Sequence, residues 1–257
     1  MNEIKQIYES KKVVRNYIKG FNKLMPAEKI LYDSLVHKLS RNAMLDLGVG
    51  AGRTTRFFAP RFNKYIGVDI SYGMIEACKK IFRNLTNAEF IIANAASLPP
   101  LSVNKFDFIM FSFNGIDYLT LDERILFCAD SYNLLENDGI FAFSTHNANA
   151  IKRLYRYRLP SRTNPLGFIT EIFHYIKIRK INGSMNRFLN KSFFHIYDGG
   201  EYFKALTAYI LPSYQISILK NAGFNKVETI DMKGNYIPVE KADLYDNEWI
   251  HYICHKN

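Results

Sequence analysis

The spacing of apolar residues alternates between two periods over residues 43–146. Between short apolar runs, hydrophobic residues recur every three or four positions, as in the set that begins at Met74, and this spacing is typical of helices with one apolar face. The runs themselves have the length of strands and lie at Ala43–Leu47, Tyr65–Asp69, Phe90–Ala93, Phe106–Phe113 and Ile140–Ser144. Strands that alternate with helices predict an α/β fold with a doubly wound, mostly parallel sheet.

The flanking segments complete this plan. The alternation lapses after residue 146 and resumes with a helix over Tyr214–Ala222, followed by strands at Lys226–Met232 and Trp249–His255. Seven strands are therefore expected, with a helical or irregular cap inserted after the fifth. We predict a single domain with four parts: an N-terminal helical segment (1–40), a core (41–146), a cap segment (147–208) and a closing helix with a strand pair (209–257).

The composition is that of an ordinary globular chain. Of its 257 residues, 48% are hydrophobic and 23% are charged, which excludes a disordered or fibrous protein. No apolar run approaches the ~18 residues of a membrane-spanning helix. The three cysteines stand far apart and exclude a disulfide framework. With no apolar signal segment at the N-terminus, a cytoplasmic location is expected.

The net charge of +10 is concentrated in one segment. Residues 151–191 contain ten bases and a single acid, Glu171, and aromatic residues are interleaved with the bases. Such a segment predicts contact with an acidic acceptor, an anionic membrane surface or RNA. The alternative is an ordinary solvated basic face.

A glycine cluster lies where the first predicted strand meets a helix. It reads Leu45-Asp46-Leu47-Gly48-Val49-Gly50-Ala51-Gly52, and glycines at such a place let the backbone turn tightly and approach a ligand. Asp69 ends the next strand, 21 residues after Gly48, where an acid can accept hydrogen bonds from ribose hydroxyls. The GxGxG spacing differs from the GxGxxG of dinucleotide-binding proteins.

These residues resemble those of the class I S-adenosylmethionine-dependent methyltransferases, over about 40–146 and again over 212–255. The resemblance implies that family's seven-stranded fold, S-adenosyl-L-methionine as the cofactor and an N-terminal helical lid. It also implies a set of cofactor-binding residues: Asp46, Gly48, Gly50, Gly52, Asp69, Ile70, Asn94, Ala95, Ser112 and Asn114. Asn94 is a departure, because the family usually has Asp there.

Other candidates follow from position alone. Arg53 succeeds the third glycine, Met74 lies one turn into the next helix, and Tyr17 lies on the predicted lid; each is a candidate cofactor contact. Asp117 and His146 follow strands four and five, at the carboxyl edge of the sheet, where ligands bind. We predict that His146 is a general base and that Asp117 belongs to the same catalytic site. No metal site is expected.

The predicted activity is methyl transfer to O or N of a small-molecule, glycan or carrier-linked acceptor. The basic segment predicts that this acceptor is acidic. Peripheral membrane contact is a further possibility that the basic segment raises. One alternative is an RNA methyltransferase that uses the cap for phosphate contacts, and another is a non-catalytic cofactor-binding protein. A nicotinamide-dependent dehydrogenase is disfavoured by the glycine spacing, and the only YxxxK match, Tyr8 to Lys12, precedes the glycine turn.

Overall fold

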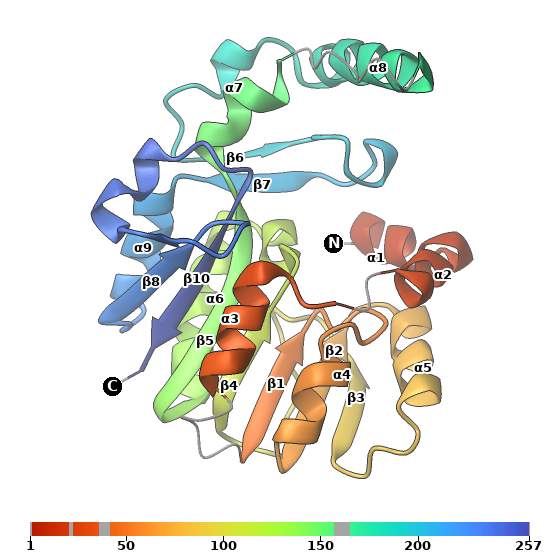
Figure 1. The fold of residues 1–257 in the computed structure, drawn as a ribbon, viewed down its shortest axis with the longest axis vertical. Coiled ribbons are helices and arrows are strands. Elements are labelled where there is room, and N and C mark those ends of the chain that lie inside the picture. Colours follow the sequence, from red (N-terminus) through yellow and green to blue (C-terminus); the bar gives the residue numbers. More distant parts are fainter. Residues whose placement is uncertain (1, 21–22, 36–41, 157–164, 257) are drawn as a thin grey trace.

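A twisted central sheet organises the computed structural model, which describes residues 2–20, 23–35, 42–156 and 165–256 (Figure 1). The strands run in the order β3-β2-β1-β4-β5-β10-β8-β9. The first five pair in parallel, and β10 is antiparallel to both β5 and β8. The predicted seven-stranded arrangement is confirmed, and the short β9 and two strands of the cap are additions to it. The strand bounds are β1 Ala43–Leu47, β2 Lys64–Asp69, β3 Ala88–Ile92, β4 Phe106–Phe111, β5 Leu135–Asn147, β8 Lys226–Ile230, β9 Tyr236–Ile237 and β10 Trp249–His255.

Helices cover both faces of the sheet, which is why β1 and β4 are buried along their whole length. One face packs Met44 and Phe108 against α3 (Pro26–Leu35) and α4 (Thr55–Phe58). The other packs Leu45 against α6 (Leu121–Leu134) and α9 (Pro212–Asn221). Successive residues of one strand therefore belong to different halves of the core.

Three helices lie beside the carboxyl end of β2. These are α1 (Asn2–Glu9), α2 (Lys11–Lys19) and α5 (Tyr72–Ile81), and Figure 1 shows α1 and α2 above α5 at the edge where the parallel strands end. Met74 and Ala77 of α5 form a small apolar cluster with Val13, Val14 and Tyr17. The N-terminal helices thus cover the sheet edge at which the glycine turn lies.

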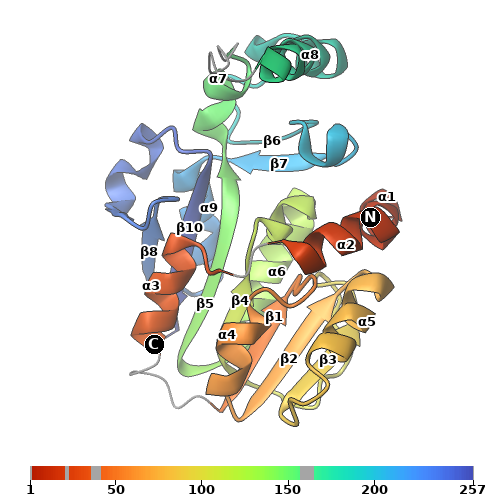
Figure 2. The ribbon, with the colours of Figure 1, turned by 45° about the vertical axis from the view of Figure 1, so that its right-hand side comes forward.

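The cap segment differs from its prediction, because it contains strands. An antiparallel hairpin of β6 (Phe193–Ile196) and β7 (Thr207–Ile210) crosses above the sheet, and β7 pairs in parallel with the end of β5 (Figure 2). The helices α7 (Ile151–Leu154) and α8 (Pro165–Asn182) pack on this hairpin around buried Ile178 and Tyr209. Each strand has only four residues, which is too short a run for its apolar pattern to identify it in the sequence.

Strand β5 is also longer than expected and ends at Asn147 rather than Ser144. His146 therefore lies within the strand, held in register with Tyr209 of β7 and Trp249 of β10.

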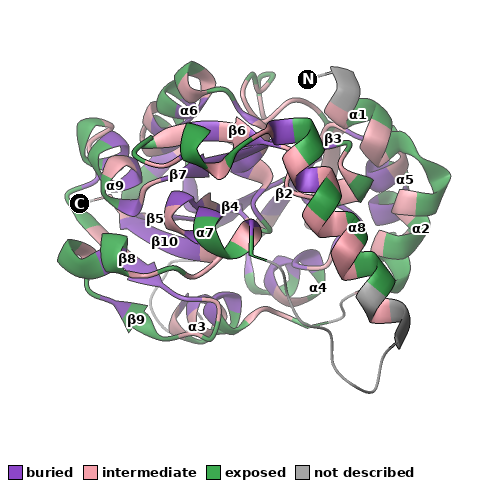
Figure 3. Ribbon diagram, turned by 90° about the horizontal axis from the view of Figure 1, so that it is seen from above, coloured by how far each residue is buried: buried purple, intermediate pink, exposed green. Residues whose placement is uncertain are grey.

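The view from above in Figure 3 shows α8 at the outside of the molecule, where Ile169, Phe173 and Ile176 are each more than half exposed. None of the helices in the described ranges has the length and apolarity to cross a membrane.

Candidate functional site

The first cavity begins at the glycine turn between β1 and α4. Gly48, Gly50 and Gly52 have φ of +62°, +55° and +82°, a region that side chains rarely adopt. The backbone N–H of Val49 donates to Val68 O at 3.0 Å and ties the turn to β2. Gly50 and Tyr17 both line the cavity, and a Cβ on Gly50 would lie 3.3 Å from the ring of Tyr17. The turn thus presents bare backbone to a ligand.

Asp69 lies at the end of β2 and faces the same cavity. Its Oδ2 accepts from the N–H of Gly50 and its Oδ1 from the N–H of Ser71, both at 2.9 Å. Burial raises the pKa of this carboxyl group, and the backbone N–H groups oppose the rise. A carboxylate has about four lone-pair sites, so it retains capacity for two hydroxyl donors. These are the requirements for holding the two hydroxyls of a ribose.

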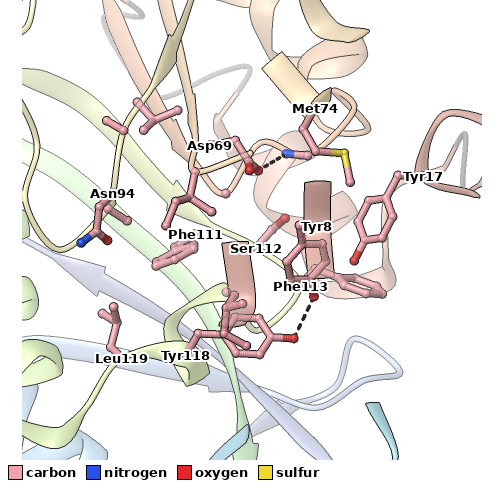
Figure 4. Close-up of a pocket in the computed structure, with 18 residues that line it drawn as sticks. Tyr8, Tyr17, Asp69, Met74, Asn94, Phe111, Ser112, Phe113, Tyr118 and Leu119 are labelled. Atoms are coloured by element: carbon pink, nitrogen blue, oxygen red, sulfur yellow. Dashed lines mark hydrogen bonds between the residues drawn. The ribbon is translucent and has the colours of Figure 1, made fainter. Parts of the chain in front are cut away.

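Aromatic side chains close the cavity from the other side (Figure 4). Tyr8 and Tyr17 come from the N-terminal helices, and Phe113 and Tyr118 from the segment after β4. The hydroxyl groups of Tyr8 and Tyr118 are 2.8 Å apart and join the two walls. Burial raises the pKa of both, so each hydroxyl stays protonated. An adenosine would find flat apolar surfaces here as well as polar anchors.

Most of the predicted cofactor residues line this cavity. They are Tyr17, Gly48, Gly50, Asp69, Ile70, Met74, Asn94, Ala95 and Ser112. The Oδ1 of Asn94 accepts from the N–H of Ala96 at 3.1 Å, so its NH₂ group is the end available as a donor. An amide that donates suits a ring nitrogen of adenine.

Asp46 was predicted to bind the cofactor, and the structure places it elsewhere. Its side chain is fully buried beneath the glycine turn and accepts from Thr54 Oγ1 at 2.5 Å and from the hydroxyl of Tyr65. Burial raises its pKa to about 6, while these two hydrogen bonds lower it. Asp46 therefore supports the turn from below and does not reach the cavity.

Gly52 and Arg53 also lie outside the cavity lining. A Cβ on Gly52 would approach the ring of Phe82 to 2.1 Å, so this glycine serves helix packing. The guanidinium of Arg53 pairs with Glu28, with Nη2 to Oε1 at 2.6 Å. It also donates to Ser112 Oγ at 3.1 Å, which fixes a side chain that does line the cavity. Arg53 is thus a positioning residue in this structure.

A second cavity of about 390 Å³ adjoins the first. Both are lined by Tyr8, Tyr17, Phe113 and Tyr118, so these four rings form the boundary between them. Asn114 was predicted to contact the cofactor, but it lines this second cavity. The difference arises because Asn114 adopts a left-handed conformation, φ 59°, which turns the chain toward β5.

His146 lies in the wall of the second cavity, with its side chain 15% exposed. Its Nδ1 is 2.7 Å from Asp117 Oδ2, and an ionised carboxylate only accepts, so Nδ1 carries the hydrogen. Nε2 is left with a lone pair, 3.8 Å from Asp198 Oδ2. The ring of Tyr209 stacks on the imidazole with centroids 4.8 Å apart. His146 is held in the tautomer that a general base requires.

Asp117 was predicted to contact substrate, and its burial contradicts that role. The carboxylate is fully buried and accepts from Arg124 Nη2 at 2.5 Å, from Thr145 Oγ1 and from the backbone N–H of His146 at 2.9 Å. Arg124 is equally buried and donates to Gln215 Oε1 at 2.8 Å. Asp117 is therefore a positioning residue that orients His146.

Sequence reasoning missed the groups that the cap brings to this cavity. Asp198, Glu201 and Tyr209 come from the β6–β7 hairpin, and Trp249 begins β10. Glu201 follows two glycines and has φ 45°, the first of three consecutive residues with positive φ. The pair Gly199-Gly200 was the one sequence feature that could have indicated a tight turn here. Within the part of the chain that the structure describes, no group of three His, Cys, Asp or Glu side chains could hold a metal ion.

Comparisons with known proteins agree with this architecture. Residues 44–139 match a family model described as a methyltransferase domain. A methyltransferase from Clostridium acetobutylicum, titled S-adenosylmethionine-dependent, is 17% identical with a TM-score of 0.63, covering 100% of this chain and 98% of that one. The CcbJ methyltransferase from Streptomyces caelestis is 16% identical with a TM-score of 0.61, covering 97% and 98%. A comparison with curated proteins finds no match.

Another similar structure comes from Thermotoga maritima and is titled a possible histamine N-methyltransferase. It is 15% identical with a TM-score of 0.57, and the alignment covers 98% of this chain and 99% of that one. At identities this low, the structural similarity establishes a shared fold.

Proposed function

We propose that the chain is a class I S-adenosylmethionine-dependent methyltransferase, and that it transfers a methyl group to O or N of a small-molecule acceptor bound in the second cavity. One observation carries the proposal. A cavity with the groups that adenosine needs shares a wall of four aromatic rings with a cavity that contains an oriented histidine.

The first cavity would hold S-adenosyl-L-methionine through a few groups. Asp69 would accept from the ribose hydroxyls, the NH₂ group of Asn94 would donate to adenine, and Gly48 and Gly50 would let the ligand approach the backbone. The bound cofactor supplies an electrophilic methyl group. The aromatic rings of the boundary, including Tyr17, exclude water from the space between the two ligands.

His146 performs the proton chemistry in this proposal. Its Nε2 accepts a proton from the acceptor O–H or N–H, and Asp117 stabilises the resulting imidazolium through Nδ1. The guanidinium of Arg124 lies against the Asp117 carboxylate in the same buried network. The chain thus contributes orientation and a proton acceptor, and no covalent intermediate on the protein is needed.

The proposal is tested by equilibrium binding and by turnover. Calorimetry should detect binding of S-adenosylhomocysteine to the purified chain, and substitution of Asp69 should weaken it. A chain that binds a nicotinamide dinucleotide in preference to S-adenosylhomocysteine would contradict the proposal. A screen with methyl-labelled cofactor against amines, phenols and sugar acids then tests for transfer.

A further inference from the structure

We propose that the second cavity selects an acceptor that carries a protonated amine, and that His146 removes the proton of that amine. This inference rests on the proposed methyltransferase function, and it names the class of acceptor. It differs from the expectation of an acidic acceptor, which came from the charge of residues 151–191. Of the bases in that segment, Arg156 is the one among the described residues that lines the cavity.

Several polar groups of the cavity wall are hydrogen-bond acceptors, and they stand beside donors such as Arg156, Trp249 and the tyrosine hydroxyls. The carboxylates of Asp198 and Glu201 only accept, and Nε2 of His146 presents a lone pair because Nδ1 donates to Asp117. Asn114 is 5% exposed, and its amide lies beside the imidazole, with Nδ2 3.4 Å from Nδ1 of His146. An ammonium group, with its several N–H donors, fits this set.

The charges of the wall favour a cation. Among the described residues, four carboxylates line the cavity, from Glu171, Asp198, Glu201 and Glu248, and one guanidinium, from Arg156. Glu248 pairs with Arg153 at 3.3 Å, which leaves three carboxylates to act on a ligand. Asp198 is 10% exposed and so is weakly screened by solvent.

Arg156 does not cancel this field. It is exposed, and it also lines a hollow on the outside of the cap together with Lys152 and Arg179. Lys12 and Lys177 approach the outer side of the 199–203 turn, where each lies over an aromatic ring of that turn. Within the described part of the cap, Lys152, Lys177 and Arg179 do not line the cavity.

The apolar part of the wall suits the same ligand. Tyr209 and Trp249 both flank the imidazole of His146, and Phe113 packs edge-on against Trp249 with centroids 5.1 Å apart. Aromatic faces attract ammonium groups through their quadrupole as well as binding apolar surface. Such a wall accommodates an amine attached to a flat or apolar body.

The position of the acids places the amine beside the first cavity. Burial raises the pKa of Tyr8 and Tyr17, and the charge of Glu201 raises both further, so this carboxylate lies close to the rings that separate the two cavities. An amine held between Glu201 and Asp198 would give its proton to Nε2 of His146. The freed nitrogen lone pair then forms the bond to the methyl carbon, and sulfur retains the electron pair of the broken S–CH₃ bond.

The test uses three probes of nearly equal size that differ in charge: 2-phenylethylamine, 2-phenylethanol and 3-phenylpropanoate. Their binding to the full chain, saturated with S-adenosylhomocysteine, is measured by calorimetry at pH 7.5. We expect the amine to bind at least 10-fold more tightly than the alcohol, and the carboxylate to bind most weakly. Equal affinities, or tighter binding of the carboxylate, would overturn the inference.

Variants identify the groups responsible. Asp198→Asn and Glu201→Gln preserve shape and remove charge, and each should weaken amine binding about 10-fold, the loss of one charge-assisted contact. Glu136→Gln, which neutralises an exposed carboxylate outside both cavities, is the matched control and should change nothing. Unchanged amine affinity in both cavity variants would refute the assignment. Binding of S-adenosylhomocysteine by the wild type is measured first, so that failure of the proposed function is recognised separately.

Discussion

The hydrogen bonds of Asp69 allow a quantitative prediction for cofactor binding. In Asp69→Ala, the ligand loses a charge-assisted acceptor, which is worth about 1.5–3 kcal/mol. Since 1.36 kcal/mol corresponds to a factor of ten, the dissociation constant of S-adenosylhomocysteine should rise about 10- to 150-fold. The variant also removes the acceptors of the Gly50 and Ser71 N–H groups, so part of the loss comes from a less ordered turn.

A second substitution separates the two contributions. Asp69→Asn retains one side-chain oxygen, which can still accept from Gly50 or Ser71, but it removes the negative charge. We expect its affinity to lie between those of the wild type and Asp69→Ala, with a free energy of unfolding closer to the wild type.

The measurement is isothermal titration of S-adenosylhomocysteine, accompanied by urea denaturation of each variant. Glu136→Ala, at an exposed carboxylate that lines neither cavity, is the control and should bind as the wild type does. Wild-type affinity in Asp69→Ala would refute the assignment of this carboxylate to the ribose. A loss in Asp69→Ala that is fully matched by loss of folding would show that Asp69 acts on the turn alone.

Three further predictions concern His146, Arg124 and His251. His146→Ala should lower kcat by about 10²–10⁴ and leave binding of S-adenosylhomocysteine intact, and a loss below about threefold would exclude a general base. Arg124→Met should lower the free energy of unfolding, measured by urea denaturation, by about 3–5 kcal/mol, because it leaves the buried carboxylate of Asp117 without its partner. The double variant Arg124→Met with Asp117→Asn should recover part of this loss. Losses that simply add in the double variant would contradict the coupling of Arg124 and Asp117. Burial lowers the pKa of His251 to about 4 from 6.5, so the unfolded chain binds the proton first as the pH falls. The free energy of unfolding should therefore decrease by about 3 kcal/mol as the pH falls from 6.5 to 4. In His251→Gln this part of the pH dependence should be absent. Parallel pH profiles of the free energy of unfolding for the wild type and the variant would contradict the prediction.

The sequence by itself determined the sheet and the first cavity. The apolar runs of β1 and β4 are buried on both faces, so their hydrophobic pattern is local and unambiguous. The glycine turn and Asp69 are close in the fold because parallel strands β1 and β2 are neighbours and end at one edge. For these residues, the position in the chain is enough to predict their place in the fold.

Tertiary structure alone decided which polar residues face a ligand. Asp46 and Asp69 both belong to the motif region, but the first is fully buried under Tyr65 and Thr54, while the second lines the cavity. Asp117 and Asn114 are three residues apart, yet one supports His146 from within the core and the other faces the second cavity. Sequence spacing does not contain this information, because burial depends on which distant side chains pack above each position.

The charge of the second cavity was also decided by tertiary structure. The excess of bases in residues 151–191 is visible in the sequence, but Asp198 and Glu201 between β6 and β7 line the cavity, and of the described bases of that segment only Arg156, which is exposed, does so. Charge composition sums over a segment, whereas a ligand responds to the few groups within a Debye length that solvent does not screen. The pairing of β7 with β5 sets which groups those are, and it joins residues more than sixty positions apart in the sequence.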